Sequence, residues 1–158
     1  MDRTNNLFSL PPVLVLHVKN GYEDRARHME AMLGARNIPF TYILDGDISD
    51  LNQNILTKYF AEGMRKFDGA TSCALKHIYA YEYIISHGLE GALIMEDDML
   101  LYKNFESIFQ KCMQECKDRM LDYCLISLED SNLQFVKGSV RIKGQCLYLG
   151  ARDRFTGC

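Results

Sequence analysis

Short apolar segments alternate with amphipathic segments along most of this chain. The alternation begins with an apolar run at 13–18, an amphipathic stretch at 23–36 and a second apolar run at 40–44. This order predicts a strand–helix–strand unit, in which the two strands are parallel and the connection is right-handed. The pattern continues further along, so the sequence predicts an α/β protein with a mostly parallel open sheet and helices on both faces.

The later elements are predicted from apolar runs and capping residues. Ser72 predicts the start of a helix that ends near Gly88, and Asn104 predicts the start of another that runs to about Met120. The first of these helices is expected to bury Leu75, Ile78, Tyr79 and Ile85. Strands are predicted at 91–95 and 123–128, an irregular helical segment at 49–64, a hairpin at 134–142 and one more strand at 145–149.

Length and composition limit the classes of protein to consider. The chain has 158 residues, 47% of them hydrophobic and 25% charged, which predicts one folded domain over residues 1–158 and excludes wholesale disorder. A net charge of −3 argues against a nucleic-acid partner. No apolar run approaches the roughly 20 residues needed to span a bilayer. We expect a cytoplasmic protein with reduced cysteines, whose contact with a membrane, if any, is peripheral.

Acidic residues follow three of the predicted strands. They are Asp45 and Asp47 after the second strand, residues 96–98 after the third and residues 129–130 after the fourth. Ligands of open α/β sheets bind outside the carboxyl ends of the strands. The sequence therefore predicts the functional site at this acidic edge.

Three consecutive carboxylates, Glu96-Asp97-Asp98, come directly after the third predicted strand. A hard divalent cation with oxygen ligands would relieve their mutual repulsion. Because alternate residues point to the same side, Glu96 and Asp98 are expected to face one ion while Asp97 faces away. A solvated acidic turn without a metal explains the same residues, and the pattern alone does not decide between the two.

Other polar residues have ordinary explanations at this stage. Cys73 and His77 share a helix face, but as a metal pair they lack partners nearby, so zinc is rejected at this point. Lys76 and Arg25 are able to contact phosphates, although solvated side chains are the commoner outcome. Neither GxGxxG, GxxxxGK nor GxSxG occurs, which argues against dinucleotide enzymes, P-loop NTPases and α/β-hydrolases.

Several motifs together resemble glycosyltransferase family 25, which includes lipooligosaccharide galactosyl- and glucosyltransferases and is related to the procollagen galactosyltransferases. Residues 71–77, Thr-Ser-Cys-Ala-Leu-Lys-His, are similar to the family's Gly-Cys-x-x-Ser-His motif. Residues 92–98 match its Ala-Leu-Ile-x-Glu-Asp-Asp segment. The resemblance covers almost the whole chain, but Ser72 and Lys76 replace the Gly and Ser of the first motif.

The resemblance implies a GT-A type (Rossmann-like) fold and an inverting transfer of galactose or glucose from a UDP-sugar to a saccharide acceptor, as in lipopolysaccharide biosynthesis. It implies Mn²⁺ or Mg²⁺ at Glu96 and Asp98, where the ion would assist departure of the diphosphate. The donor would be held by the remaining residues of the acidic edge and its surroundings: Val18, Arg25, Asp45, Gly46, Lys76 and Asp97. His77 and Asp130 are the candidate catalytic residues. The family's acceptor-side half is expected beyond residue 158.

Two other functions stay open. A metal-dependent phosphohydrolase or nucleotidyltransferase would use the same acidic edge. A truncated, non-catalytic transferase domain would bind partners only. Metal-dependent binding of UDP separates the transferase from both.

Overall fold

The computed structural model describes residues 10–121, 125, 126, 128 and 147. The chain divides between Leu101 and Tyr102 into two compact units, which are described separately. The prediction of a single domain stays a prediction. The strand expected at 123–128 lies largely outside the described residues, and the hairpin and strand expected at 134–149 lie outside them except for residue 147.

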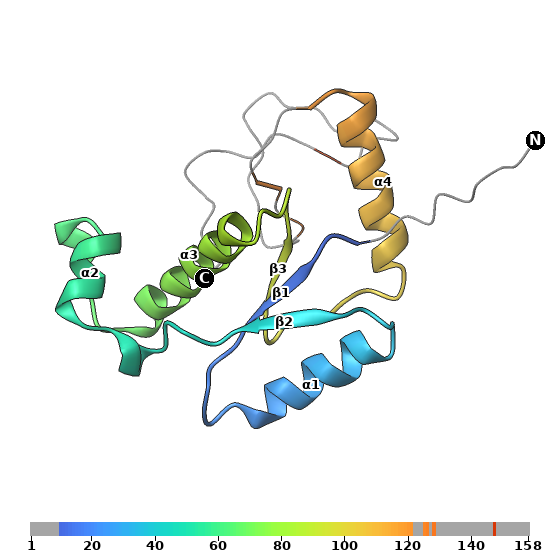
Figure 1. Cartoon of the computed structure of the whole chain (residues 1–158). Helices are drawn as coiled ribbons and strands as arrows, with labels where there is room; N and C mark the ends of the chain where they lie inside the picture. The colour runs from blue at the N-terminus through green and yellow to red at the C-terminus, as the bar shows by residue number, and fades with distance from the viewer. Residues whose placement is uncertain (1–9, 122–124, 127, 129–146, 148–158) are drawn as a thin grey trace, which may run out of the picture. The chain divides into compact units, whose positions relative to one another are not determined.

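The first unit is built on a parallel sheet of three strands (Figure 1). The strands are β1 (Val13–Leu16), β2 (Phe40–Ile43) and β3 (Leu93–Glu96), in the order β2-β1-β3. All four residues of β1 are buried, as expected for a central strand. Leu16 pairs with Ile43 on one side and with Glu96 on the other, so the three carboxyl ends are level. The predicted α/β fold with a parallel sheet is confirmed.

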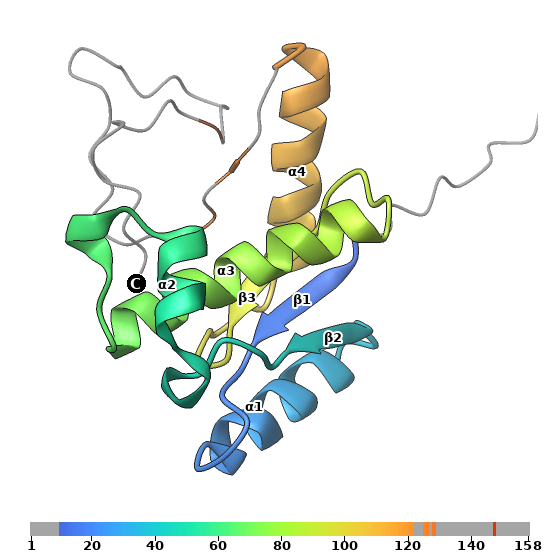
Figure 2. The same ribbon diagram turned by 60° about the vertical axis from the view of Figure 1, so that its left-hand side comes forward.

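Two long helices cover opposite faces of this sheet (Figures 1 and 2). Helix α3 (Gly69–Ser86) packs Ala80 against Leu14 and Leu16. Helix α1 (Glu23–Gly34) buries Met29 and Leu33, and the hydroxyl of Tyr42 in β2 donates to the Ala26 carbonyl of α1. Helices on both faces were predicted, and this prediction is confirmed.

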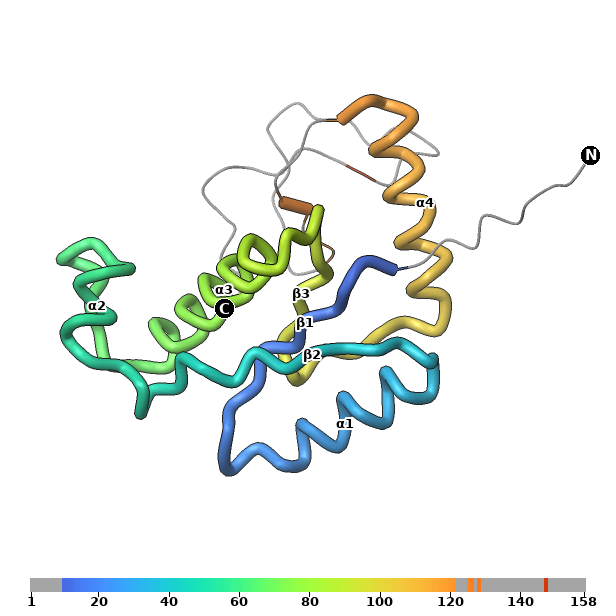
Figure 3. The backbone as a smooth tube through the Cα atoms, viewed as in Figure 1, coloured from blue at the N-terminus to red at the C-terminus, as the bar shows by residue number. Residues whose placement is uncertain are grey.

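The segment between β2 and α3 consists of short helical pieces, which follow one another in Figure 3. They are a 3-10 turn at Ile48–Asp50, helix α2 (Gln53–Tyr59) and a second 3-10 turn at Glu62–Met64. Leu51 and Leu56 pack with Leu75 of α3 in a buried cluster. The predicted irregular helical segment is confirmed.

Two predictions for α3 are wrong. The helix begins at Gly69, not at Ser72, because the Asp68 carboxylate accepts from the Thr71 amide at 2.8 Å and caps it one turn earlier. Ile85 is 78% exposed, because the face that meets the sheet runs through Tyr79, Ala80 and Tyr83 instead. Leu75 is fully buried as predicted.

In the second unit the structure describes one helix, α4 (Phe105–Asp118). Asn104 stands at its N-terminus as predicted, but its side chain makes no capping hydrogen bond. Phe109, Cys112 and Cys116 are buried. Among the described residues, no helix has the length and apolar character needed to cross a membrane.

Candidate functional site

The candidate site lies in the first unit, where the three parallel strands end. The loops that follow β1, β2 and β3 meet there with the first turns of α3. Acidic residues lie at the carboxyl ends of β2 and β3, and the functional role of this edge stays a prediction. Asp130, the candidate base after the expected fourth strand, lies outside the described residues.

Asp97 is buried in a network that joins β1, α1 and the loop after β3. Its Oδ2 accepts from His17 Nδ1 at 2.7 Å, and its Oδ1 accepts from the Arg25 guanidinium at 2.8 Å. The hydrogen bond to Asp97 raises the pKa of Arg25 above its ordinary value. Both oxygens of Asp97 are therefore occupied within the protein, and the side chain fixes the loop rather than facing solvent.

The two neighbours of Asp97 are more accessible. The Asp98 side chain is 53% exposed, and its Oδ2 lies 3.1 Å from the Arg25 guanidinium. The Glu96 side chain is 34% exposed. These two carboxylates are more accessible than Asp97, and Glu96 faces His77 of α3 whereas Asp98 shares Arg25 of α1 with Asp97. That Glu96 and Asp98 face one cation stays a prediction.

Lys76 lies buried beneath the loop after β2. Its ammonium is 2.7 Å from Asp47 Oδ1 and donates to the carbonyls of His17 and Leu44, both at 2.8 Å, and of Asp45 at 3.3 Å. Four oxygens surround the charge, so Lys76 holds the loops after β1 and β2 together. The phosphate contact predicted for Lys76 would have to replace these interactions.

Gly46 lies over the first turns of α3. Its φ of +99° is strained for any residue with a side chain, and a Cβ would lie 3.3 Å from Cγ of Lys76. Its carbonyl accepts from the Ser72 hydroxyl at 2.7 Å. The departure from the family motif at Ser72 therefore has a structural role, which is to fasten this loop to the helix.

Lys19, Asp45 and Asp50 form a charged group at the same edge. The Lys19 ammonium lies 2.9 Å from Asp50 Oδ2 and 3.0 Å from Asp45 Oδ1, which raises the pKa of Lys19. Lys19 in turn lowers the pKa of Asp50, whose Oδ2 also accepts from the amides of Gly46 and Asp47. Val18, the remaining predicted donor-site residue, is half-buried and stands between His17 and Lys19 in the sequence.

An open hollow of about 690 Å³ lies between β2 and α3. Lys19, Asp45 and Asp50 line it together with the tyrosines of β2 and α3. Its full lining is Lys19, Tyr42, Ile43, Leu44, Asp45, Gly46, Asp50, Tyr79, Glu82, Tyr83 and Ser86. The combination of aromatic rings and charged groups suits a ligand with a flat ring and a polar substituent.

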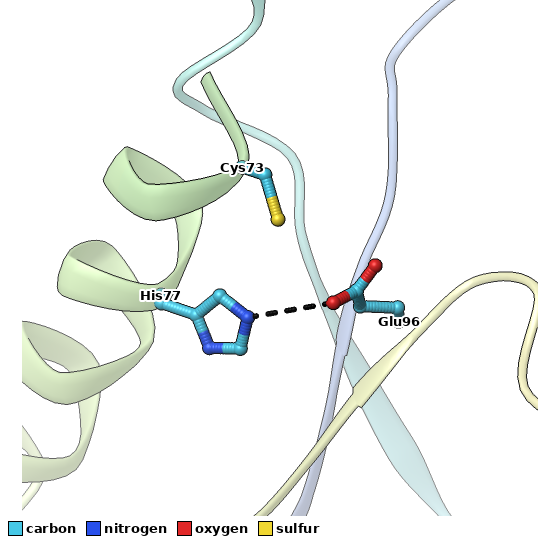
Figure 4. Close-up of side chains that lie close together, drawn as sticks. All are labelled: Cys73, His77 and Glu96. Carbon is cyan, nitrogen blue, oxygen red and sulfur yellow. Dashed lines mark ion pairs between the residues drawn. The ribbon is translucent and has the colours of Figure 1, made fainter. Parts of the chain in front are cut away.

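His77 and Cys73 of α3 lie across from Glu96 at the end of β3 (Figure 4). His77 Nε2 is 3.8 Å from Glu96 Oε1, and one donor atom of each of the three residues lies within 4.8 Å of the others. The sequence-based expectation that Cys73 and His77 lack a further ligand nearby is therefore wrong. Glu96 comes close only through the fold, because β3 follows α3 and runs back along it.

Sequence reasoning missed His17 and the role of Asp47. Both are buried polar residues near strand ends, His17 directly after β1 and Asp47 in the loop after β2, and this position in the sequence was the available signal. Their partners, Asp97 and Lys76, lie 80 and 29 residues away, so neither pairing has a local sequence pattern.

Comparisons with known proteins agree with the resemblance seen in the motifs. A segment of 66 residues, 42% of this chain, is 32% identical to procollagen galactosyltransferase 1 of Danio rerio and covers 11% of that protein's length. The family model described as glycosyltransferase family 25 (LPS biosynthesis protein) matches residues 12–146. The match covers most of the chain, including the loops after β1, β2 and β3, and the chain therefore belongs to glycosyltransferase family 25.

Proposed function

We propose that this chain carries the donor site of a metal-dependent glycosyltransferase, which transfers galactose or glucose from a UDP-sugar to a saccharide acceptor. The observation that carries the proposal is the difference in accessibility among the carboxylates of Glu96, Asp97 and Asp98. Asp97 is buried and hydrogen-bonded to His17 and Arg25, whereas its two neighbours are partly exposed, Asp98 beside Arg25 and Glu96 facing His77. Family membership and the similarity to a galactosyltransferase support the same reaction class.

Glu96 and Asp98 would hold Mn²⁺ or Mg²⁺, since carboxylate oxygens are the ligands these hard cations prefer. When bound, the ion would neutralise the diphosphate that departs from the sugar. The protein's own contribution is rigidity. Asp97 is locked by two charge-assisted hydrogen bonds, so Asp98 is presented from a fixed turn, and Arg25 at its side supplies a positive charge that also suits a phosphate.

The nucleoside would bind at the β2 side of the edge. The hollow beside β2 offers Tyr79 and Tyr83 as flat apolar surfaces, and Asp45 with Lys19 as polar groups at one end. Gly46 lets the loop that borders this hollow lie close against α3, because a side chain at this position would press on Lys76 and Leu75.

An inverting transfer needs a base that takes the proton of the acceptor hydroxyl. His77 and Asp130 stay the predicted candidates. The His77 imidazole is 27% exposed and faces Glu96. The role in lipopolysaccharide synthesis, the cytoplasmic location and any peripheral contact with a membrane stay predictions.

The proposal is tested by titrating UDP into the metal-depleted chain, with and without Mn²⁺, by calorimetry and by thermal shift. We expect UDP to bind and raise Tm only when Mn²⁺ is present, and EDTA to abolish both effects. Asp98→Asn should weaken this binding by at least about tenfold, because one anionic ligand of the cation is lost.

Glu90→Gln is the matched control, since Glu90 is an exposed carboxylate outside the site and its loss should leave UDP binding unchanged. If Asp98→Asn binds UDP as well as the parent does, the metal assignment is wrong. If Mn²⁺ promotes no UDP binding in the parent but the protein releases inorganic phosphate from simple phosphate esters, the phosphohydrolase is the better assignment. If neither occurs, the non-catalytic binding domain is favoured.

A further inference from the structure

Cys73, His77 and Glu96 offer three different metal-binding atoms from two elements of the first unit. Cys73 and His77 are four residues apart on α3, so both project from one face, and Glu96 reaches them from the end of β3 (Figure 4). The three donor atoms lie within 4.8 Å of one another. The hard-cation site proposed above uses only Glu96 from this group.

The His77 ring is placed as a ligand would be. Its Nε2 atom is buried and has no hydrogen-bond partner among the described residues, and it faces the Glu96 carboxylate at 3.8 Å. A buried polar nitrogen without such a partner carries a desolvation cost that a metal ion would remove. The His77 and Glu96 side chains remain 27% and 34% exposed, so an ion has a way in from solvent.

We propose that Cys73, His77 and Glu96 bind a Zn²⁺ ion. Thiolate, imidazole and carboxylate are the ligands zinc takes in proteins, and tetrahedral coordination with ordinary bond lengths places ligand atoms roughly 3.3–3.7 Å apart. The separation of 3.8 Å between His77 and Glu96 is close to this range, and none of the three exceeds 4.8 Å. Small side-chain rotations complete the geometry.

Three protein ligands leave the fourth coordination position of the zinc to water or to an oxygen of a bound anion, as in catalytic zinc sites. The site differs from the Mn²⁺ site in chemistry. A thiolate selects a softer ion than Mn²⁺, and Asp98 does not belong to this group of three. Since both sites use Glu96, zinc would compete with Mn²⁺, and a zinc-bound His77 would no longer serve as the base.

The experiment uses the whole chain, reduced and depleted of metal. Zn²⁺ is titrated by calorimetry in the absence of UDP, and Co²⁺ is used as a spectroscopic probe. We expect one ion per chain, and a thiolate-to-cobalt charge-transfer band with the visible absorption of tetrahedral Co²⁺. Cys73→Ser should abolish the charge-transfer band. Cys73→Ser and His77→Gln should each weaken zinc binding by more than about 100-fold. Losing a group that only supports a ligand typically costs roughly 10–100-fold.

His87→Gln is the matched control, since His87 lies at the exposed end of the same helix and its loss should not affect zinc binding. Far-UV circular dichroism tests whether each variant is folded. If the Cys73 variant does not fold, zinc binding by the His77 variant tests the proposal. Zinc binding that survives Cys73→Ser and His77→Gln unchanged, or a Co²⁺ complex without the charge-transfer band, would overturn the proposal.

The zinc site stands independently of the proposed transferase activity. Asp98→Asn should weaken Mn²⁺-dependent UDP binding by at least about tenfold and leave zinc binding intact, because Asp98 is not one of the three zinc ligands. A parent protein that binds zinc but not UDP refutes the transferase alone. If the protein binds UDP with Mn²⁺ but does not bind zinc, the zinc site is refuted and the transferase proposal stands.

Discussion

Lys76 places a charge inside the protein and surrounds it with oxygen atoms. Its side chain is 5% exposed and that of Asp47 is 9% exposed, so the pair is shielded from water on both sides. Removing one partner of such a pair leaves the other as an uncompensated buried charge. The interaction therefore fixes the loops more than an ion pair at the surface could.

Lys76→Met is expected to destabilise the protein by about 3–5 kcal/mol, the usual loss when one member of a buried ion pair is removed. The loss of unfolding free energy is measured from the shift of the urea midpoint. Lys58→Met is the control, because Lys58 is 67% exposed and its pair with Glu82 lies at the surface. Adding Asp47→Asn to Lys76→Met should recover part of the loss, and a double variant no more stable than Lys76→Met would contradict the buried-charge explanation.

Gly46→Ala is expected to destabilise the protein by about 1–3 kcal/mol, because the residue has a φ of +99° and its new Cβ would press on Lys76. Chemical denaturation measures the change. Gly91→Ala is the comparison, since a Cβ there meets nothing within 4 Å and the backbone is not left-handed. Equal stability of the two variants would show that the Gly46 loop is not constrained.

At the level of secondary structure, the start of α3 shows how two suitable residues compete for one role. Asp68 and Ser72 are both good caps, and the helix begins at the earlier one. The Ser72 hydroxyl donates instead to Gly46, which is 26 residues away. Capping preference alone does not choose between them, because the choice depends on a contact made by the folded chain.

Asp68→Ala is expected to lower Tm at neutral pH by roughly 4 °C, through loss of the cap on α3. The hydrogen bond from the Thr71 amide lowers the pKa of Asp68, so its carboxylate stabilises the folded state at neutral pH. That contribution falls as the pH drops below the ordinary range of aspartate and the carboxylate takes up its proton.

Melting curves of the parent and Asp68→Ala between neutral and acidic pH measure this effect. The difference in Tm should shrink in acid, while Asp68→Asn, which keeps a capping oxygen without the charge, should have a Tm between those of the parent and Asp68→Ala at neutral pH and approach the parent in acid. A difference that is constant across the pH range would assign the effect of Asp68→Ala to helix propensity rather than to the carboxylate.

At the scale of the molecule, local patterns predicted the parallel sheet, both covering helices and the acidic strand ends. Apolar runs and helical spacing are local properties, so they can be read along the chain. The ends of elements were less certain, as Ser72 shows. The contacts that build the site, such as Asp97 with His17 or Glu96 with His77, join residues far apart, and a single sequence contains no direct sign of them.

The central position of β1 has a consequence for how the site forms. β1 comes first in the chain, but the partner of His17 lies 80 residues later, at the end of β3. Closing so long a loop costs chain entropy before any contact repays it, and contacts of this kind slow folding. During synthesis, the β1–α1–β2 unit can form early, whereas the buried Asp97 network must wait until β3 has emerged.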